Sequence, residues 1–126
     1  MTIVNFAHPL RTSHIAAIEA AAGAPVDRIV SVPTHFDQTR SFASQVVATV
    51  DAAKLTSEEW QTLNLVIVPP SLAAIACLVM AEIHGRAGYF VPVIRLRLRP
   101  GVLPPAFEVA EVLDVQGQRE SARSRR

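Results

Sequence analysis

A long apolar run from Leu65 to Ala81 constrains the fold of this chain more than any other feature of the sequence. A Pro-Pro-Ser segment at 69–71 interrupts it, whereas a membrane-spanning helix needs roughly 20 unbroken apolar residues. The run therefore indicates a strand over Leu63–Val68, buried on both faces, followed by a separate helix. Ser71 is expected to be the N-cap of that helix, which should reach about His84.

Turn residues divide the rest of the chain into short elements. The expected strands are Thr2–Ala7, Arg28–Val32, Leu63–Val68, Tyr89–Leu98 and Phe107–Val115. The expected helices run from Thr12 or Ser13 to Ala22, from Ser41 to Ala53, from Thr56 past Trp60, and from Ser71 to His84. Thr56 and Glu59 have the spacing of a capping box. The order β-α-β-α-β-α-β-β predicts one α/β domain over residues 1–115, with a mostly parallel sheet and helices on both faces.

Charge and cysteine content exclude several classes of protein. The net charge is only +1, and the last eight residues carry four Arg and one Glu, so the rest of the chain is slightly acidic. Such a surface does not suit duplex nucleic acid, and residues 116–126 are expected to form a disordered, Arg-rich tail. The single Cys77 rules out an internal disulfide and fits a reducing cytoplasm, which is the expected location because no signal-peptide pattern follows Met1.

Familiar cofactor and catalytic motifs are absent. The chain has no G-x-G-x-x-G, no G-x-x-x-x-G-K-[ST] and no G-x-S-x-G, so dinucleotide binding, P-loop chemistry and a nucleophile elbow are not expected. Its four histidines show no metal-ligand spacing. We therefore expect neither a cofactor nor a metal.

The predicted topology places a ligand site at one edge of the sheet. Ligands of such sheets bind outside the carboxyl ends of the strands, where the strand order reverses. If the reversal lies between the first and third strands, the segments Asn5–Ser13, Val32–His35 and Pro69–Ser71 meet there. The helix starts at Thr12/Ser13 and Ser71 would then offer amide groups to a phosphate, although Ser and Thr are also the usual structural caps. His8 could bind a ligand or transfer a proton, or it could be an ordinary loop residue.

Arginine is the other candidate group for anion binding. Arg95, Arg97 and Arg99 alternate with leucines, so their guanidinium groups share one face of a strand. They suit either a polyanionic partner or a solvated, aggregation-resistant edge. Arg86 lies at the far end of the helix from Ser71, so it would either join the site of a second subunit or stabilise the helix end.

Two stretches carry a resemblance to a known family. TIVNFAHPL at the start and AEIHGRAGYFVPVIRLR before the last strand resemble small CRISPR-associated ancillary proteins of type III systems, of the Csx group. The resemblance runs from Met1 to about Val115. It implies a Rossmann-like fold related to the CARF domain. Such proteins bind cyclic oligoadenylate second messengers, usually across a homodimer. Some members cleave the ring, and others sequester it, in some cases by stacking into higher assemblies.

The resemblance implies a function and a set of contacts. We expect the protein to bind cyclic tetra-adenylate without efficient turnover and to sequester it, which limits effector activation in antiviral signalling. The alternatives are a metal-independent ring nuclease with His8 as the base, giving linear adenylates, and an interaction protein unrelated to CRISPR. The family establishes no catalytic residue here. The expected ligand contacts are Asn5, Phe6, His8, Pro9, Thr12, Ser13, Pro70 and Ser71, with Arg86 and Arg95 supplied by either subunit.

Overall fold

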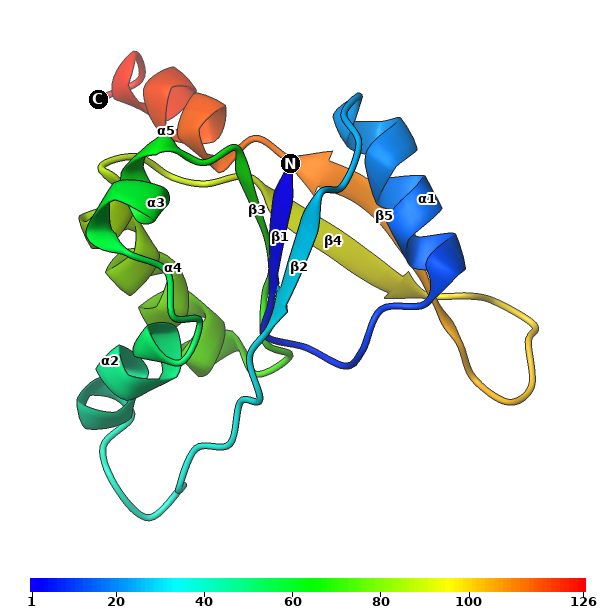
Figure 1. Cartoon of the computed structure of the whole chain (residues 1–126), viewed down its shortest axis with the longest axis horizontal. Coiled ribbons are helices and arrows are strands. Elements are labelled where there is room, and N and C mark those ends of the chain that lie inside the picture. The colour runs from blue at the N-terminus through cyan, green and yellow to red at the C-terminus, as the bar shows by residue number, and fades with distance from the viewer.

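The computed structural model describes all 126 residues as an α/β domain (Figure 1). The strands are β1 (Thr2–Asn5), β2 (Arg28–Ser31), β3 (Leu65–Val68), β4 (Val93–Leu98) and β5 (Phe107–Leu113). The helices are α1 (Thr12–Ala22), α2 (Ala43–Asp51), α3 (Ser57–Thr62), α4 (Ala73–Ala87) and α5 (Val115–Arg123). None of these helices has both the length and the apolar character to cross a membrane.

The sheet has the strand order β2-β1-β3-β4-β5, in which the first four strands are parallel and β5 is antiparallel. This confirms the predicted α/β class, and it confirms that the strand order reverses between β1 and β3. Helix α1 covers one face of the sheet, and α2, α3 and α4 cover the other (Figure 1). The chain after β1 and the chain after β3 therefore leave the same edge toward opposite faces.

Alternation along the central strands builds two cores. On β3, Leu65 and Ile67 face the layer of α2, α3 and α4, while Val66 and Val68 face α1. All four side chains are at most 1% exposed. A strand buried on both faces must be apolar throughout, which is why the apolar run was such a strong signal.

Helix α4 begins later and ends later than predicted. Ser71 is exposed and is not its N-cap, because Leu72 takes the N-cap position with an extended backbone and without a side-chain cap. The two prolines keep the chain extended past β3, which delays the first helical turn. Gly85 lies inside the helix rather than ending it, and the helix stops at Gly88, whose φ of 86° favours glycine.

The last parallel strand starts at Val93 rather than Tyr89. Pro92 has no amide hydrogen and cannot donate to the sheet, but its carbonyl oxygen accepts a hydrogen bond from the Ile67 amide at 2.9 Å. The proline is thus the last residue before regular pairing. Beyond Val93, β4 continues past the end of β3 and pairs only with β5, so the β4–β5 hairpin projects from the carboxyl edge of the sheet.

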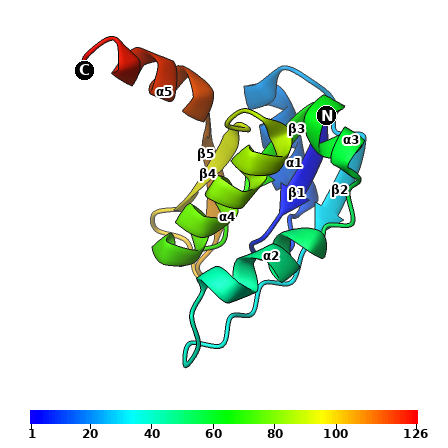
Figure 2. The ribbon, with the colours of Figure 1, turned by 90° about the vertical axis from the view of Figure 1, so that its left-hand side faces the viewer.

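The tail does not have the disordered form expected from residue 116. Helix α5 forms over Val115–Arg123 and projects away from the body of the molecule (Figure 2). Asp114 caps it by accepting a hydrogen bond from the Gly117 amide at 2.8 Å. The Gln116 side chain anchors its first turn by accepting from the Phe90 amide at 2.9 Å. Polar composition alone predicted disorder, but the cap and the anchor supply local order.

The capping box predicted at the start of α3 is confirmed. The Thr56 hydroxyl accepts from the Glu59 amide at 3.1 Å, and the Glu59 carboxylate accepts from the Thr56 amide at 3.0 Å. Glu59 also pairs with Arg28 on β2 at 2.9 Å. The Thr56 amide and then the Arg28 guanidinium lower the pKa of Glu59 below its ordinary value. The box therefore ties α3 to the outer strand of the sheet.

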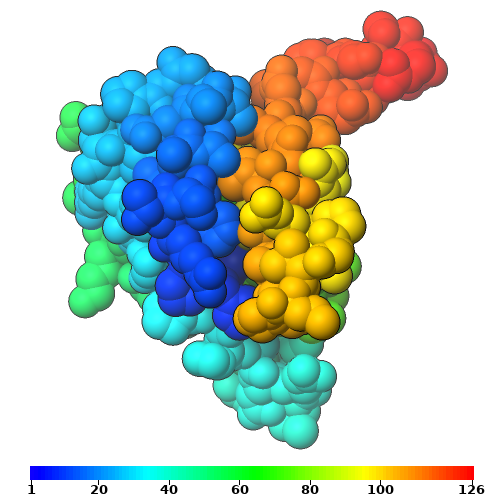
Figure 3. Space-filling view, turned by 90° about the vertical axis from the view of Figure 1, so that its right-hand side faces the viewer, coloured from blue at the N-terminus to red at the C-terminus, as the bar shows by residue number.

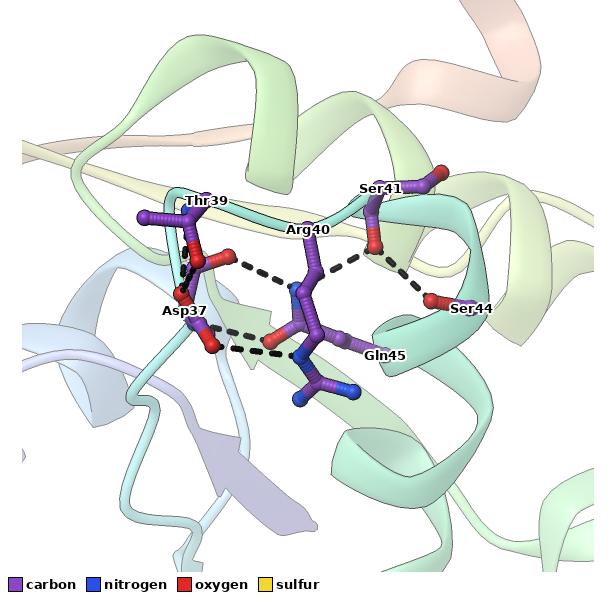
Figure 4. Close-up of polar contacts among 6 residues, drawn as sticks. All are labelled: Asp37, Thr39, Arg40, Ser41, Ser44 and Gln45. Carbon is purple, nitrogen blue, oxygen red and sulfur yellow. Dashed lines mark hydrogen bonds and ion pairs between the residues drawn. The ribbon is translucent and has the colours of Figure 1, made fainter.

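A polar network shapes the loop between β2 and α2 (Figure 4). The Asp37 carboxylate accepts hydrogen bonds from the hydroxyl and amide of Thr39, at 2.6 and 2.9 Å, and from Arg40 at 3.1 Å. Gln45, on the first turns of α2, accepts from the Asp37 amide at 2.8 Å. These bonds favour the ionised carboxylate and lower the pKa of Asp37, with the Thr39 hydroxyl the largest cause.

The Asp37 network predicts an acid-sensitive loop. Its folded pKa is lower than the ordinary value of 3.8, so the stabilisation is complete above 3.8 and is lost as the pH falls through the folded pKa. We expect Thr39 amide exchange, corrected for its intrinsic pH dependence, to lose protection on acidification. In Asp37→Ala, which removes the acceptor, protection should be low already at neutral pH. A carboxyl titration of Asp37 at or above 3.8 would contradict the network.

Burial predicts a large difference between two strand isoleucines. Ile67 is 0% exposed on β3, whereas Ile29 is 39% exposed on the outer strand β2. We expect Ile67→Ala to lower the free energy of unfolding by about 2–5 kcal/mol, because it leaves a cavity in the core. The matched control Ile29→Ala should cost less than about 1 kcal/mol. Urea unfolding measures both, and equal losses would contradict the described packing.

Candidate functional site

A cleft of about 810 Å³ opens at the carboxyl edge of the sheet. One wall is the loop after β1 with the first turns of α1, and the other is the β4–β5 hairpin; the two walls face each other in Figure 3, in blue and in yellow to orange. The segment Val68–Ser71 after β3 completes the lining. The cleft therefore lies at the point of strand-order reversal, where the topology places ligand sites.

The cleft collects six of the ten predicted contact residues. These are His8, Pro9, Ser13, Pro70, Ser71 and Arg95. Asn5, Phe6, Thr12 and Arg86 are not in its lining, and neither is the segment Val32–His35 that we expected at the same edge. The loop after β2 leads instead to the Asp37 network and α2, and the β4–β5 hairpin takes its place.

Asn5 and Phe6 have structural surroundings. Asn5 is 1% exposed, and its side-chain amide donates to the His8 carbonyl and accepts from the Ala7 amide, both at 2.9 Å. It thus holds the turn that presents His8. Phe6 is 3% exposed and packs in the core beneath α2 and α4, because it continues the inward face of β1 that includes Val4.

Arg86 lies in a different region. It lines a second cleft of about 480 Å³ between α3 and the end of α4. Its guanidinium pairs with Asp51 at 2.7 Å and with Glu82 at 2.8 Å. Partial burial alone would lower the pKa of Arg86, but the hydrogen bonds from its guanidinium to these carboxylates outweigh that effect and raise it. Arg86 therefore joins α4 to α2 within one chain.

The arginine row on β4 is not a bare stripe of positive charge. Arg95 pairs with Glu111 at 2.8 Å, and Arg97 pairs with Glu108 at 3.0 Å, both across the antiparallel pair with β5. Arg99 makes no ion pair and lines the cleft. Two of the three charges are thus offset by a neighbouring strand, and one remains available.

The start of α1 is capped differently from the prediction. Arg11 is the N-cap, and Thr12 and Ser13 are the first two residues of the helix. The Arg11 amide donates to Nδ1 of His14 at 3.0 Å, so the hydrogen of the neutral ring is on Nε2. Nε2 then donates to the Phe107 carbonyl at 2.9 Å. His14 thereby joins the two walls of the cleft.

Unpaired positive groups lie on both walls. Arg11, at the start of α1, makes no ion pair and faces the same cleft as Arg99 on the hairpin. The amides of Thr12 and Ser13 have no partner within the helix, and they lie at its positive dipole end. The one carboxylate in the lining, Glu108, is held by Arg97. This arrangement suits an anion such as a phosphate.

Sequence reasoning missed three cleft residues. Arg11 was passed over because a Thr or Ser cap was expected one residue later. His14 carried no signal, since its role depends on a contact with Phe107, 93 residues away. For Phe107, the sequence predicts only the start of a strand. The pairing of β4 with β5, which brings Phe107 to the cleft, is a long-range feature.

The cleft holds no evident catalytic constellation. The side chain of His8 is exposed and has no hydrogen-bond partner that would orient it. No three His, Cys, Asp or Glu side chains come together as a metal site requires. What the cleft offers is cationic groups, free amides and apolar surface, which are means of binding.

Comparisons with known proteins return no match. No family model, no curated protein and no solved structure matches this chain. The comparisons therefore add no support to the resemblance described above.

His14 predicts a measurable coupling between the cleft walls. Its replacement in His14→Ala removes the cap on the Arg11 amide and the bond to the Phe107 carbonyl. We expect a loss of about 1 kcal/mol in the free energy of unfolding and faster exchange of the Arg11 amide. His8→Ala is the matched control, and it should stay within about 0.5 kcal/mol of the native chain. If Arg11 exchange is unchanged in His14→Ala, the described cap is wrong.

Proposed function

We propose that this protein is a CARF-like ancillary protein that binds a cyclic oligoadenylate, most simply cyclic tetra-adenylate, and holds it intact. One observation carries the proposal. Arg11 and Arg99, two arginines that make no ion pair, line opposite walls of the carboxyl-edge cleft. Ser13, in the first turn of α1, also lines the cleft, and its amide has no partner within the helix. Sequestration of the messenger would limit activation of type III effectors.

The chemistry of the cleft supports a nucleotide rather than a simple anion. Cationic donors suit phosphates, and the apolar lining, which includes Leu10, Leu96 and Phe107, suits bases and riboses. The net charge of only +1 is compatible with binding of a cyclic nucleotide, because a ring with few phosphates needs only a few hydrogen-bond donors near the site. Among nucleotide ligands, we choose a cyclic oligoadenylate because of the resemblance that the two stretches carry.

The surroundings of the histidines support binding over cleavage. Attack by a ribose hydroxyl needs a base held in line with the reacting phosphate. His8 lacks an orienting partner, and both ring nitrogens of His14 are engaged in structural hydrogen bonds. Binding without cleavage needs no positioned base, so the site fits a sequestering role.

A second copy of the chain would complete the site. One cleft of about 810 Å³ is within the size range for a single drug-sized ligand, whereas cyclic tetra-adenylate is a ring of four nucleotides. A near-twofold ring matches a twofold dimer. The outer surface of α4 presents Ala73, Cys77 and Ala81, which are exposed and uncharged and could pack on another copy.

The test uses radiolabelled cyclic tetra-adenylate on a native gel and a denaturing gel in parallel. We expect stoichiometric retardation, with the ligand recovered intact after long incubation. Multiple turnover to linear products would establish the ring nuclease instead. Absence of binding to rings of any size would reject both nucleotide functions and favour an interaction protein.

Arg99 and Arg97 form a matched pair for this assay. They lie two residues apart on the hairpin, but only Arg99 is unpaired and in the cleft lining. We expect Arg99→Ala to weaken binding roughly tenfold to a hundredfold, as loss of a charge-assisted hydrogen bond of about 1.5–3 kcal/mol implies. Because Arg97→Ala alone would free the Glu108 carboxylate in the lining, the control is the double variant Arg97→Ala, Glu108→Ala, which removes the paired charges together and should bind like the native chain. The reverse order of effects would show that the cleft is misassigned.

A further inference from the structure

An apolar row on the hairpin continues beyond the helix that covers it. Cross-strand partners on the α1 face of β4 and β5 are Ile94 with Val112, Leu96 with Val109, and Leu98 with Phe107. Ile94 is 1% exposed, whereas Leu98 and Phe107 are 56% and 53% exposed. The row is buried under α1 and becomes exposed past its first turn. Leu98 and Phe107 thus form an uncovered apolar shelf, and Phe107 lines the cleft.

Phe107 is the one exposed ring among the phenylalanine, tyrosine and tryptophan side chains. Phe6 and Trp60 are buried, and the remaining phenylalanines and Tyr89 are partly buried. The rings of Phe36 and Phe42 pack edge to face, with their centroids 5.3 Å apart. The Phe90 ring packs at a tilt against His84, with centroids 4.1 Å apart. Every other phenylalanine, tyrosine or tryptophan side chain therefore packs within the fold. Leaving a phenylalanine half exposed forfeits burial worth about 1 kcal/mol or more.

The backbone beneath the Phe107 ring is held on both sides. Its strand pairs with β4 through Leu98, and the carbonyl oxygen of Phe107 accepts a hydrogen bond from His14 at 2.9 Å. The ring is therefore presented from a paired strand rather than from a loose loop. A planar ring on a paired strand can stack with a flat ligand at a lower cost in conformational entropy than one on a loose loop.

The groups around the ring define the ligand that it fits. Arg99, which makes no ion pair, lies on the same hairpin, and Arg11 lines the opposite wall. An aromatic face beside unpaired guanidinium groups is the combination that binds nucleotides, through base stacking and phosphate contacts. An apolar peptide would leave the guanidinium groups without partners.

We propose that Phe107 is the stacking surface for an adenine base of the bound ring. This inference rests on the proposed function and adds to it a base-recognition point that the predicted contacts did not include. It assigns phosphate binding to Arg11, Arg99 and the start of α1, and base binding to the hairpin. The two contributions can be separated by substitution.

The first experiment measures affinity for cyclic tetra-adenylate. Stacking on an aromatic side chain is worth enough that Phe107→Ala should weaken binding roughly tenfold to a hundredfold, whereas Phe107→Tyr should retain it. Leu103→Ala is the matched control, because Leu103 is 89% exposed on the same hairpin and does not line the cleft. It should bind like the native chain. Urea midpoints close to that of the native chain show that Phe107→Ala is folded.

The second experiment reads stacking directly. The only tryptophan, Trp60, is 2% exposed and is not in the cleft lining, so ligand should leave native emission unchanged. In Phe107→Trp, a stacked adenine should quench the added emission in proportion to bound ligand.

The outcomes distinguish the two levels of the proposal. If the native chain binds the ring but Phe107→Ala binds equally tightly, the stacking role is overturned and the function stands. Unquenched emission from saturated Phe107→Trp overturns it as well. If the native chain binds no cyclic oligoadenylate, both the function and the stacking role are rejected.

Discussion

The cleft at the carboxyl edge of the sheet depends on the position of β1 between β2 and β3. Strand β1 is paired on both sides and buried on both faces, and it runs parallel to β3. The two strands therefore end at the same edge of the sheet. The chain then leaves β1 toward α1 on one face and leaves β3 toward α4 on the other. Two segments that diverge from adjacent strands leave an opening that neither covers, and the cleft lies there.

Ion pairing, rather than the net charge of the chain, determines where positive charge is available in this protein. Arg86, Arg95 and Arg97 each have carboxylate partners supplied by another element. Exposed pairs of this kind contribute little to stability, but they remove charge that would otherwise attract ligands unselectively. What remains in the cleft is a pair of cations on opposing walls. A net charge near zero is therefore compatible with a local anion site.

The sequence predicted local features well because they depend on neighbouring residues. The strands follow from short β-rich or apolar runs between turn residues, and the Thr56–Glu59 box follows from a spacing of three residues. The burial of Phe6 could also have been foreseen, since it has the same parity as Val4 along β1. Taking it as a ligand contact ignored that alternation.

Features that depend on distant residues could not be predicted. The partners of Arg95 and Arg97 follow from the register between β4 and β5, which includes a shift after Arg95. The bond from His14 to Phe107 joins a helix start to a strand start across most of the chain. Segment composition carries no information about either contact. The helix at residues 115–123 likewise depends on an anchor to Phe90.

The projecting hairpin has a consequence for motion. Past the end of β3 it is a ribbon of two strands, and such a ribbon is only marginally stable by itself. Few contacts therefore set the free energy of local unfolding of the hairpin, chiefly those with the first turn of α1 and the hydrogen bond from His14. The buried central strands are expected to unfold only with the whole domain. The cleft thus has one rigid wall and one wall that can yield. An occupant of the cleft, if the proposed binding holds, would therefore be able to leave by displacement of the yielding wall alone, while the core stays closed.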